Sequence, residues 1–227
     1  MPGSQLGPDV APHVLALYLD APLQSWGYQS RFDRRTSLSY PTRSGIVGML
    51  CAALGVDRRD RSGLERVDKG VSIQAVAFGD ASLLVDYHTV GGGFDSRVQS
   101  QSIAPKADGS KGDTVVSRRE YLQEARFGVL VSAETPLLDE VSAALSDPRW
   151  GIWLGRKSCI PASPVPQGVF TTTEEALLHL EELAGGKATR QVTEVERFDE
   201  GTDTLLDRPV DFATREYKPR RVVHESL

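Results

Sequence analysis

The spacing of apolar residues in the first part of the chain predicts a buried strand, a polar loop and a helix. The run 14–19 is mostly apolar and has the length of a strand. After a loop rich in polar residues, apolar residues recur through 46–54 at spacings that place them on one face of a helix. Ser44 is the predicted N-cap of this helix, and Gly55 is its predicted end.

Alternation of apolar and polar residues then predicts strands at 71–75 and 83–90, giving the order β-α-β-β. The segment 91–114 is almost free of apolar residues. A structureless loop of that length is uncommon within a compact domain and is usually functional or disordered. Because 115–122 again resembles a strand, we expect 84–122 to be a projecting hairpin whose tip is ordered by a partner.

The second half of the chain predicts a smaller unit that follows a proline cluster. Prolines at 161, 164 and 166 mark the expected boundary between a main domain, 1–160, and a small C-terminal subdomain, 161–227. The remaining elements expected from the pattern are a short helix at 62–69, a strand at 127–132, a helix at 136–145, a short strand at 152–154, a helix opened by the capping box Thr172-x-x-Glu175, and strands at 191–198 and 210–217.

A stripe of small residues on the first helix requires a physical cause. Gly45, Gly48 and Ala52 follow one another at spacings of three and four, although each interior glycine costs about 1 kcal/mol relative to alanine. One interpretation is that the helix packs closely on a sheet. The other is that the free N–H groups at the helix start, with Arg43 beside them, accept a phosphate.

Charge is distributed unevenly along the chain, whose formal net charge is −5. Residues 31–61 include seven basic and three acidic residues, whereas 174–208 include ten acidic and four basic ones. A basic segment is typical of a nucleic-acid contact and also of a solvated face. The acidic segment is expected to face protein or solvent.

The sequence has no feature of a secreted or membrane protein. No run approaches the roughly 20 apolar residues of a membrane span, and the start lacks the basic and apolar regions of a signal peptide. The two cysteines, Cys51 and Cys159, do not form a disulfide framework. We therefore expect a cytoplasmic protein without membrane contact.

Arginine and aromatic residues occur together in the arm after the polar segment and in a later turn. Arg118, Arg119 and Tyr121 can grip phosphates and stack on bases, although charge also keeps an edge strand soluble. Arg156 and Lys157 follow a glycine, which suits either a phosphate contact or a tight turn with cations in water.

Residue patterns for catalysis are sparse. The four histidines form no metal pair, and there is no P-loop, nucleophile elbow or carboxylate cluster for a divalent metal. We therefore expect neither a metal nor a cofactor. His88 is either a structural residue or a general acid or base acting on a ribose 2′-OH without metal.

Six motifs, taken together and in this order, resemble one protein family across most of the chain. The set resembles the CasD, or Cas-five, subunits of the type I-E CRISPR surveillance complex Cascade, within the RAMP superfamily. The motifs are APLQSWG (21–27), YPTRSGIVGMLCAALG (40–55), DYHTV (86–90), SRREYL (117–122), LGRKSC (154–159) and FATREY (212–217).

The resemblance implies an α+β fold and a role in a ribonucleoprotein. The fold would be a ferredoxin-like, RRM-related domain with a long projecting β-hairpin thumb and a smaller C-terminal β-rich part. The implied function is non-catalytic capture of the 5′ handle of CRISPR RNA in antiviral defence, at one end of the complex. Implied partners are that RNA, the Cas-seven-type backbone subunit, the large PAM-reading subunit and, indirectly through the complex, target DNA.

Capture of a single-stranded RNA end requires cations for the phosphates and side chains that contact splayed bases. We expect these groups to converge on one face. The thumb-tip residues Arg97, Lys106 and Lys111 are expected to contact the adjacent subunit or the guide. The candidate RNA-binding residues are Gln24, Trp26, Arg34, Arg35, Arg43, Ser44, Arg118, Arg119, Tyr121, Arg156 and Lys157.

The alternative function is metal-independent cleavage of precursor RNA. Type I-C relatives do this with a tyrosine, a lysine and a histidine. Tyr40 falls at the tyrosine position and His88 is the available histidine, but the lysine-histidine pair is replaced by Arg118 and Arg119. Arginine, with a pKa above 12, is a poor general base, which disfavours cleavage.

Overall fold

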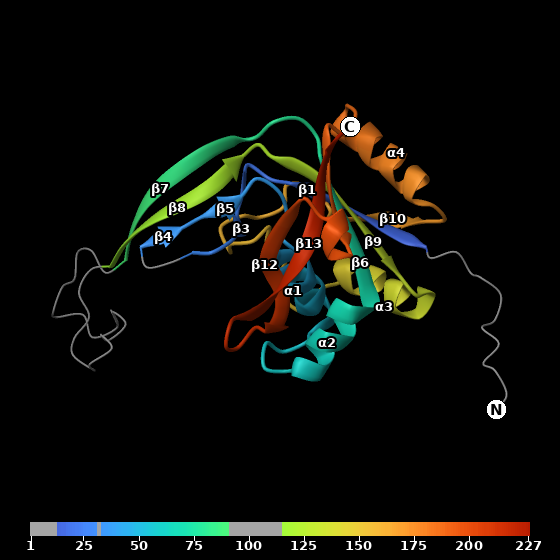
Figure 1. Cartoon of the computed structure of the whole chain (residues 1–227), viewed down its shortest axis with the longest axis horizontal. Coiled ribbons are helices and arrows are strands. Elements are labelled where there is room, and N and C mark those ends of the chain that lie inside the picture. The colour runs from blue at the N-terminus through green and yellow to red at the C-terminus, as the bar shows by residue number, and fades with distance from the viewer. Residues whose placement is uncertain (1–12, 31–32, 91–114) are drawn as a thin grey trace.

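The computed structural model describes residues 13–30, 33–90 and 115–227. Its centre is a seven-stranded sheet in the order β10-β1-β9-β6-β11-β13-β12, in which every neighbouring pair is antiparallel (Figure 1). These strands are β1 (Val14–Asp20), β6 (Val71–Ala77), β9 (Arg126–Ala133), β10 (Pro166–Phe170), β11 (Arg190–Val195), β12 (Asp203–Asp211) and β13 (Glu216–Ser226).

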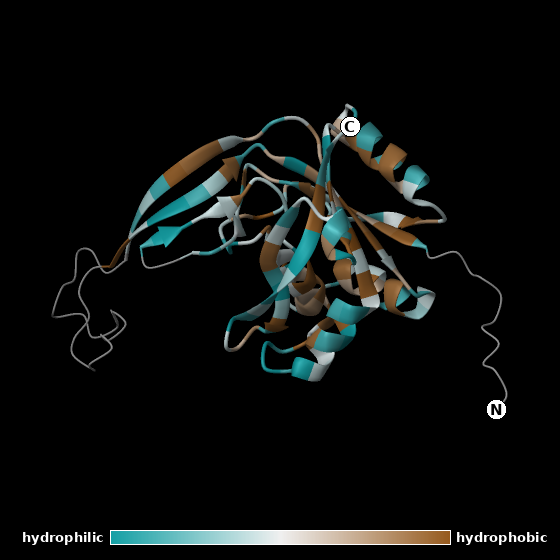
Figure 2. Cartoon of the chain, in the orientation of Figure 1, coloured by the Kyte–Doolittle hydropathy of each residue, from teal (hydrophilic) through white to brown (hydrophobic). Residues whose placement is uncertain are grey.

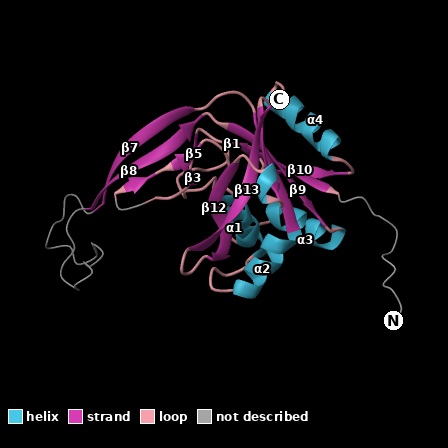
Figure 3. Ribbon diagram, in the orientation of Figure 1, coloured by secondary structure: helices cyan, strands magenta, loops and turns pink. Residues whose placement is uncertain are grey.

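Helices cover both faces of this sheet (Figure 3). Helices α1 (Arg43–Leu54), α2 (Arg61–Gly70) and α3 (Thr135–Ser146) lie on one face, and α4 (Thr173–Ala184) lies on the other. Alternate residues of β1 point to opposite faces. Its odd-numbered residues 15, 17 and 19 therefore pack with α1 to α3, and 14, 16 and 18 pack with α4.

The predicted order β-α-β-β is realised with a different third strand, because residues 83–90 form β7 (Ser82–Val90), which lies outside the main sheet. Apart from α2 and the residues from 82 to 123, the elements β1, α1, β6, β9, α3 and β10 follow one another as β-α-β-β-α-β, and their strands are neighbours in the order β10-β1-β9-β6; the sequence analysis did not predict β10. The strands predicted at 14–19, 71–75 and 127–132 are therefore confirmed as β1, β6 and β9. None of the described helices has the length and apolar character needed to cross a membrane.

Helix α1 begins earlier than the sequence analysis predicts. Thr42, in an extended conformation, is the N-cap, and its hydroxyl accepts a hydrogen bond from the Gly45 N–H at 3.2 Å. The prediction of Ser44 was wrong because two cap-type residues lie close together and Thr42 directly follows Pro41. Gly55 ends the helix at φ 75°, as predicted.

The small residues of α1 permit close packing. A Cβ atom on Gly45 would lie 2.9 Å from a ring carbon of Trp26, and one on Gly48 would lie 3.6 Å from the ring of Phe212. Close packing is therefore confirmed at Gly45, whereas Gly48 would accept a Cβ at an ordinary contact distance. The close neighbour of Gly45 is the Trp26 side chain of a short strand, and not the main sheet that the sequence analysis expected.

Strands from residues beyond 160 stand at both edges of the sheet. β10 pairs with β1, whereas β11 pairs with β6 and carries β13 and β12 beyond it. This arrangement differs from the predicted division at 160, because the C-terminal strands continue the main sheet. The strands β11, β12 and β13 nevertheless enclose a small hydrophobic cluster of their own, made of Val192, Leu205 and Val222.

Several predicted C-terminal elements need correction. Residues 152–154 form a loop instead of a strand, and 210–217 span the end of β12, a turn and the start of β13. β11 ends at Val195 and is followed by a 3-10 turn, Phe198–Glu200. The helices α2, α3 and α4 confirm the predictions at 62–69, at 136–145 and after Thr172, whose hydroxyl caps α4 through the Glu175 N–H.

A two-stranded arm projects from the sheet (Figure 1). Strands β7 (Ser82–Val90) and β8 (Val115–Gln123) pair antiparallel along their full lengths, which confirms the two predicted strands of the thumb. The predicted tip, 91–114, lies outside the described residues. Short strands from the loop after β1 accompany the arm: β2 (Leu23–Gln24) and β4 (Arg34–Arg35) pair with β8, and β3 (Trp26–Gly27) pairs with β5 (Ser37–Leu38).

Candidate nucleic-acid interface

Four arginines meet at the root of the arm because β4 runs parallel to β8. Arg34 stands opposite Arg118, and Arg35 stands opposite Arg119. The Arg118 N–H also donates to the Asp33 carbonyl at 2.8 Å, which fixes this register. Side chains opposite each other share a face of the sheet. Arg34 and Arg118 are therefore on one face, and Arg35 and Arg119 are on the other.

A fifth arginine reaches the same place from the loop after α3. Arg156 donates to the carbonyl oxygens of Glu120, at 3.0 Å, and Arg35, at 2.8 Å. Its guanidinium also lies 4.6 Å from the centre of the Tyr121 ring. We call Arg34, Arg35, Arg118, Arg119 and Arg156 the root arginines. Carbonyl oxygens and a ring hold Arg156 in place without neutralising its charge.

Gly155 allows this loop to approach the start of β3. It adopts φ +95°, and a Cβ atom there would lie 1.7 Å from the Ser25 carbonyl oxygen. The Ser25 N–H donates to the Leu154 carbonyl at 3.1 Å, which holds the two segments together. The glycine in the GRKSC turn therefore positions Arg156 against the arm.

A pocket of about 270 Å³ opens between these segments and the start of α1. Arg35 and Arg156 supply its cationic wall, and Tyr217 and Phe212 close another side. The remaining lining residues are Ser25, Trp26, Gly27, Ser30, Thr42, Ser44, Gly45 and Gly155. Cations, hydroxyls and aromatic rings around one opening provide the groups that bind phosphate and ribose.

Two N–H groups at the start of α1 are already occupied. The Asp207 carboxylate accepts the Arg43 N–H at 2.8 Å, and the Thr42 hydroxyl accepts the Gly45 N–H. A carboxylate at a helix start takes the place that a phosphate would occupy there. The interpretation of this helix start as a phosphate site with Arg43 beside it is therefore wrong.

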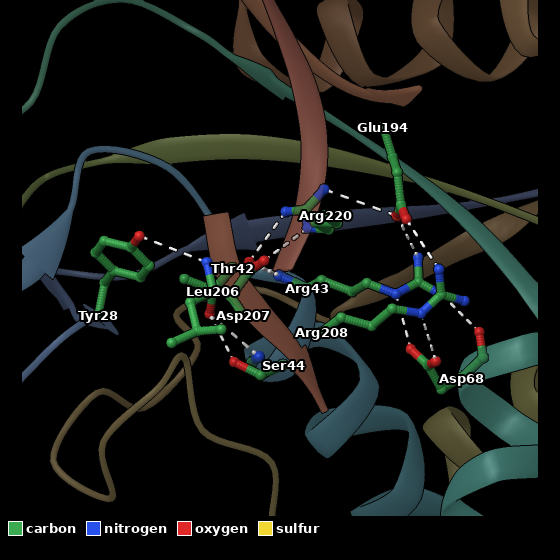
Figure 4. A network of polar contacts seen from close by, with 11 residues as sticks. Tyr28, Thr42, Arg43, Ser44, Asp68, Glu194, Leu206, Asp207, Arg208 and Arg220 are labelled. Carbon is green, nitrogen blue, oxygen red and sulfur yellow. Dashed lines mark hydrogen bonds and ion pairs between the residues drawn. The ribbon is translucent and has the colours of Figure 1, made fainter. Parts of the chain in front are cut away.

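Arg43 belongs to a buried ionic network (Figure 4). Only 3% of it is exposed; its guanidinium pairs with Asp68 at 2.7 Å and with Glu194 at 2.9 Å. Arg208 contacts the same two carboxylates, at 2.9 and 3.1 Å. Because carboxylates enclose its guanidinium, Arg43 is not free to bind RNA, contrary to the sequence analysis.

Asp207 and Arg220 complete this cluster, which we call the ionic network (Arg43, Arg208, Arg220, Asp68, Glu194 and Asp207). Arg220 forms a two-pronged pair with Asp207, at 2.7 and 3.0 Å, while Asp207 also accepts the N–H of Arg43. The network joins α1 and α2 to β11, β12 and β13 (Figure 4). Glu194 and Asp207 therefore face arginines within the protein, whereas the acidic segment had been expected to face partner or solvent.

Gln24 and Trp26 are also enclosed. Gln24 is fully buried, and its amide nitrogen donates to the carbonyls of Leu19, at 2.9 Å, and Ala125, at 2.6 Å. Its amide oxygen accepts the indole N–H of Trp26, whose side chain is 1% exposed and packs on Gly45. Their polar groups are satisfied internally, so the structure contradicts their predicted contact with RNA.

The remaining candidates lie at different distances from the pocket. Tyr121 is buried under the Arg156 guanidinium, so its ring is not available to a base, contrary to prediction. Ser44 lines the pocket as a half-buried side chain. Lys157 is exposed outside it, with its ammonium 5.6 Å from the Trp153 ring centre. The tip residues Arg97, Lys106 and Lys111 lie outside the described residues.

The two candidates for RNA cleavage occupy different settings. Tyr40 packs edge-on against His224, with ring centres 5.1 Å apart, and burial with the nearby Asp203 carboxylate raises the pKa of Tyr40 to about 12. His88 lies on β7 of the arm, with Nδ1 3.7 Å from an Asp86 oxygen. Within 13–30, 33–90 and 115–227, no three His, Cys, Asp or Glu side chains are grouped to hold a metal ion.

Sequence reasoning missed several residues of the pocket. Ser30, Gly155, Phe212 and Tyr217 line it, although only Gly155 and the FATREY motif carried any signal. It also missed the apolar outer face of the arm, where Leu83, Val85 and Tyr87 are each more than half exposed. Figure 2 shows hydrophobic residues on β7. Their alternation was visible in the sequence, but which side would be left uncovered was not.

Comparison with known proteins decides the family. The model of the CRISPR-associated protein family Cas_Cas5 matches residues 14–223. The chain belongs to this family. The Escherichia coli (strain K12) protein named "CRISPR system Cascade subunit CasD" is 30% identical over 219 residues, which cover 89% of this chain and 93% of that protein. The resemblance inferred from the six motifs is therefore confirmed.

Two solved structures extend the Cas5 comparison to the fold. A chain of a "CRISPR RNA-guided surveillance complex" is 29% identical, with a TM-score of 0.77, and the match covers 94% of this chain and 90% of that one. A chain described as "Crystal structure of Cas protein" is 28% identical, with a TM-score of 0.66 and 94% of each chain covered. The mixed α and β architecture with antiparallel sheets is thus shared with Cas5 proteins.

Proposed function

We propose that this chain is a non-catalytic RNA-binding subunit of a type I-E Cascade complex, in which it captures the 5′ handle of CRISPR RNA and caps the backbone. The observation that carries the proposal is the gathering of five arginines at the root of the arm, two of which, Arg35 and Arg156, line a pocket. Similarity to a Cascade subunit and to a chain of an RNA-guided complex supports it.

The geometry suggests how capture works. Arg35 and Arg119 share the face of the arm root on which Arg156 stands beside the pocket, so cations flank a path along β8. Phosphates of a single strand would follow these cations, and sugars or bases would enter between the pocket hydroxyls and aromatic rings. Arg156 is held by backbone carbonyl oxygens and Arg119 by the Ser117 hydroxyl at 3.1 Å, and these neutral acceptors leave the positive charge of both side chains available to a phosphate.

The strand order β10-β1-β9-β6 supports assigning the first four sheet strands to a ferredoxin-like, RRM-related unit. In this assignment the arm is the thumb, and its exposed apolar residues Leu83, Val85 and Tyr87 would face the Cas-seven-type backbone subunit. The large PAM-reading subunit would be the second protein partner. Target DNA would be reached through the complex.

RNA binding by the full chain tests the proposal. Fluorescence anisotropy with a labelled single-stranded handle RNA should give salt-dependent binding that is stronger than binding to a scrambled strand. Alanine at both Arg118 and Arg119 should weaken it, whereas Arg66→Ala should not, because Arg66 lies on α2 and is paired with Glu140 at 2.7 Å. Equal affinities for the wild type and the double variant would overturn the proposal.

A cleavage assay with the same purified protein tests the nuclease alternative. Incubation of the chain with repeat RNA in EDTA should leave the RNA intact. A specific product that disappears on Tyr40→Phe or His88→Ala would replace RNA capture by metal-independent cleavage as the assigned function. The separation of Tyr40, which contacts His224, from His88 on the arm disfavours that outcome.

A further inference from the structure

A second, smaller cavity opens beside the segment that precedes α1. It measures about 140 Å³, and its floor is built from three neighbouring strands, because Val192 of β11 stands opposite Ala75 of β6 on one side and His224 of β13 on the other. The Tyr40 and His224 rings form one wall, at an interplanar angle of 62°. The cavity is therefore apolar below and aromatic on one side.

Polar groups stand around the mouth of this cavity. Arg190, Gln191, Glu225 and Ser226 line it, and the Gln191 amide is fixed by hydrogen bonds to the side chains of Gln74 and Glu225. The Tyr40 hydroxyl has no hydrogen-bond partner among the described residues. It is protonated at neutral pH, as an ordinary tyrosine is, and burial raises its pKa further, to about 12. It can therefore donate to an acceptor that enters.

The size and composition of the cavity select a class of ligand. A cavity of about 150 Å³ admits a benzene-sized ring. Edge and face contacts with aromatic rings suit a flat π-system, and the polar mouth suits a ring that carries carbonyl or amino groups. A single-ring nucleobase meets all three conditions, whereas an aliphatic chain would offer no acceptor to the Tyr40 hydroxyl.

The cavity also lies near the proposed RNA path. Tyr40 faces it, whereas Thr42, two residues later, lines the pocket beside the root arginines. Two residues span at most about 7 Å of chain. The residues Tyr40 and Thr42 therefore bring the linings of the two openings close together in the chain, and the proposal requires that the strand held at Arg35 and Arg156 extend from one opening to the other.

We propose that the cavity lined by Tyr40, Val192 and His224 receives one unstacked pyrimidine base of the bound RNA. This inference rests on the proposed function and adds a position at which the base itself is bound. Tyr40 and His224 contact the base, and the root arginines hold the backbone beside it.

Abasic RNA identifies the bound base. A series of handle RNAs, each lacking one base, is titrated against the full chain and two variants that alter only the cavity. His224→Ala removes part of the ring wall, and Ser226→Trp fills the mouth from a terminal position. Val223→Ala is the matched control, because its side chain points to the opposite face of β13. Circular dichroism melting checks that each variant folds.

The pattern of losses decides the inference. Wild type and Val223→Ala should lose roughly 5- to 100-fold in affinity when one pyrimidine is removed, the range of base stacking on aromatic side chains. Both cavity variants should bind intact RNA more weakly than the wild type, by a similar factor. Their affinity should not fall further when that pyrimidine is removed. If the loss from each cavity variant and the loss from base removal were additive at every RNA position, the proposed base site would be wrong, while RNA capture would still stand. Absence of salt-dependent binding by wild type would overturn RNA capture and the cavity together.

Discussion

Two groups of arginines in this molecule have opposite environments. The arginines of the ionic network, Arg43, Arg208 and Arg220, face three carboxylates, two of which are almost completely buried. Among the root arginines, Arg156 faces carbonyl oxygens and a tyrosine ring, and Arg34, Arg35 and Arg118 are exposed. The same residue type holds the fold together in one place and leaves positive charge available in the other.

The difference lies in where acidic partners fall in the sequence. Asp68, Glu194 and Asp207 come from α2 and the C-terminal strands, so Arg43 and Arg208 reach carboxylates that are distant in the chain, such as Glu194 for Arg43 and Asp68 for Arg208. At the arm root, Glu120 is the carboxylate in the middle of the group, and one of its oxygens accepts the Ser37 N–H at 3.0 Å. A count of charges along the chain therefore says little about function until partners are known.

The largest predicted effect is on the stability of the ionic network. Arg220→Ala leaves the buried Asp207 carboxylate without its two-pronged partner and should lower the free energy of unfolding by about 3–5 kcal/mol. Urea unfolding followed by circular dichroism measures this loss. Arg118→Ala, at an exposed position, should change the same free energy by less than about 0.5 kcal/mol. Similar losses of stability for both variants would contradict the distinction between the arginines of the ionic network and the root arginines.

A second effect concerns the glycine that brings Arg156 to the arm. Gly155→Ala should be destabilising by more than about 2 kcal/mol, because the new Cβ meets the Ser25 carbonyl and the backbone has positive φ. Gly79→Ala is the control: it also has positive φ, at +79°, but nothing lies within 4 Å of its Cβ position. Thermal unfolding of the two variants should separate the steric clash with Ser25 from the strain of a positive φ. Equal losses of stability in both variants would show that the close approach at Gly155 is unimportant.

A smaller effect tests whether Arg156 combines both roles. Arg156→Lys keeps the charge but loses the planar fork that reaches the carbonyls of Glu120 and Arg35. The free energy of unfolding should fall by about 0.5–1.5 kcal/mol, the contribution of a typical hydrogen bond. RNA affinity should fall by only a few fold. A loss of affinity as large as that of Arg156→Ala would show that geometry, and not charge, is what the RNA requires.

Local patterns predicted most of the elements. Helix α1, strands β1, β6 and β9 and the paired arms β7 and β8 follow from apolar periodicity and from the turn residues around them. Such signals are local, since a helix face or a strand face is written in a few successive residues. The hairpin of β12 and β13 was missed because its apolar and polar residues alternate through the turn.

The candidate site was predictable only in part. Sequence reasoning found the root arginines, and the parallel pairing of β4 with β8 brings four of them together. It misassigned Arg43, Gln24 and Trp26, which have residue types typical of RNA contacts but whose partners lie up to 164 residues away, as for Arg43 and Asp207. Long-range satisfaction of polar groups leaves no trace in local composition. The cavity at Tyr40 and His224 was missed because its lining comes from segments that are far apart in the sequence.

The salt dependence of RNA binding tests the central claim most directly. The logarithm of the binding constant should fall linearly with the logarithm of salt concentration, and each phosphate contact on a single strand contributes about −0.7 to that slope. The double alanine variant at Arg118 and Arg119 should have a slope shallower by roughly 0.7 to 1.4, while Arg66→Ala keeps the wild-type slope. A slope unchanged in the double variant would contradict the assignment of the root arginines to RNA.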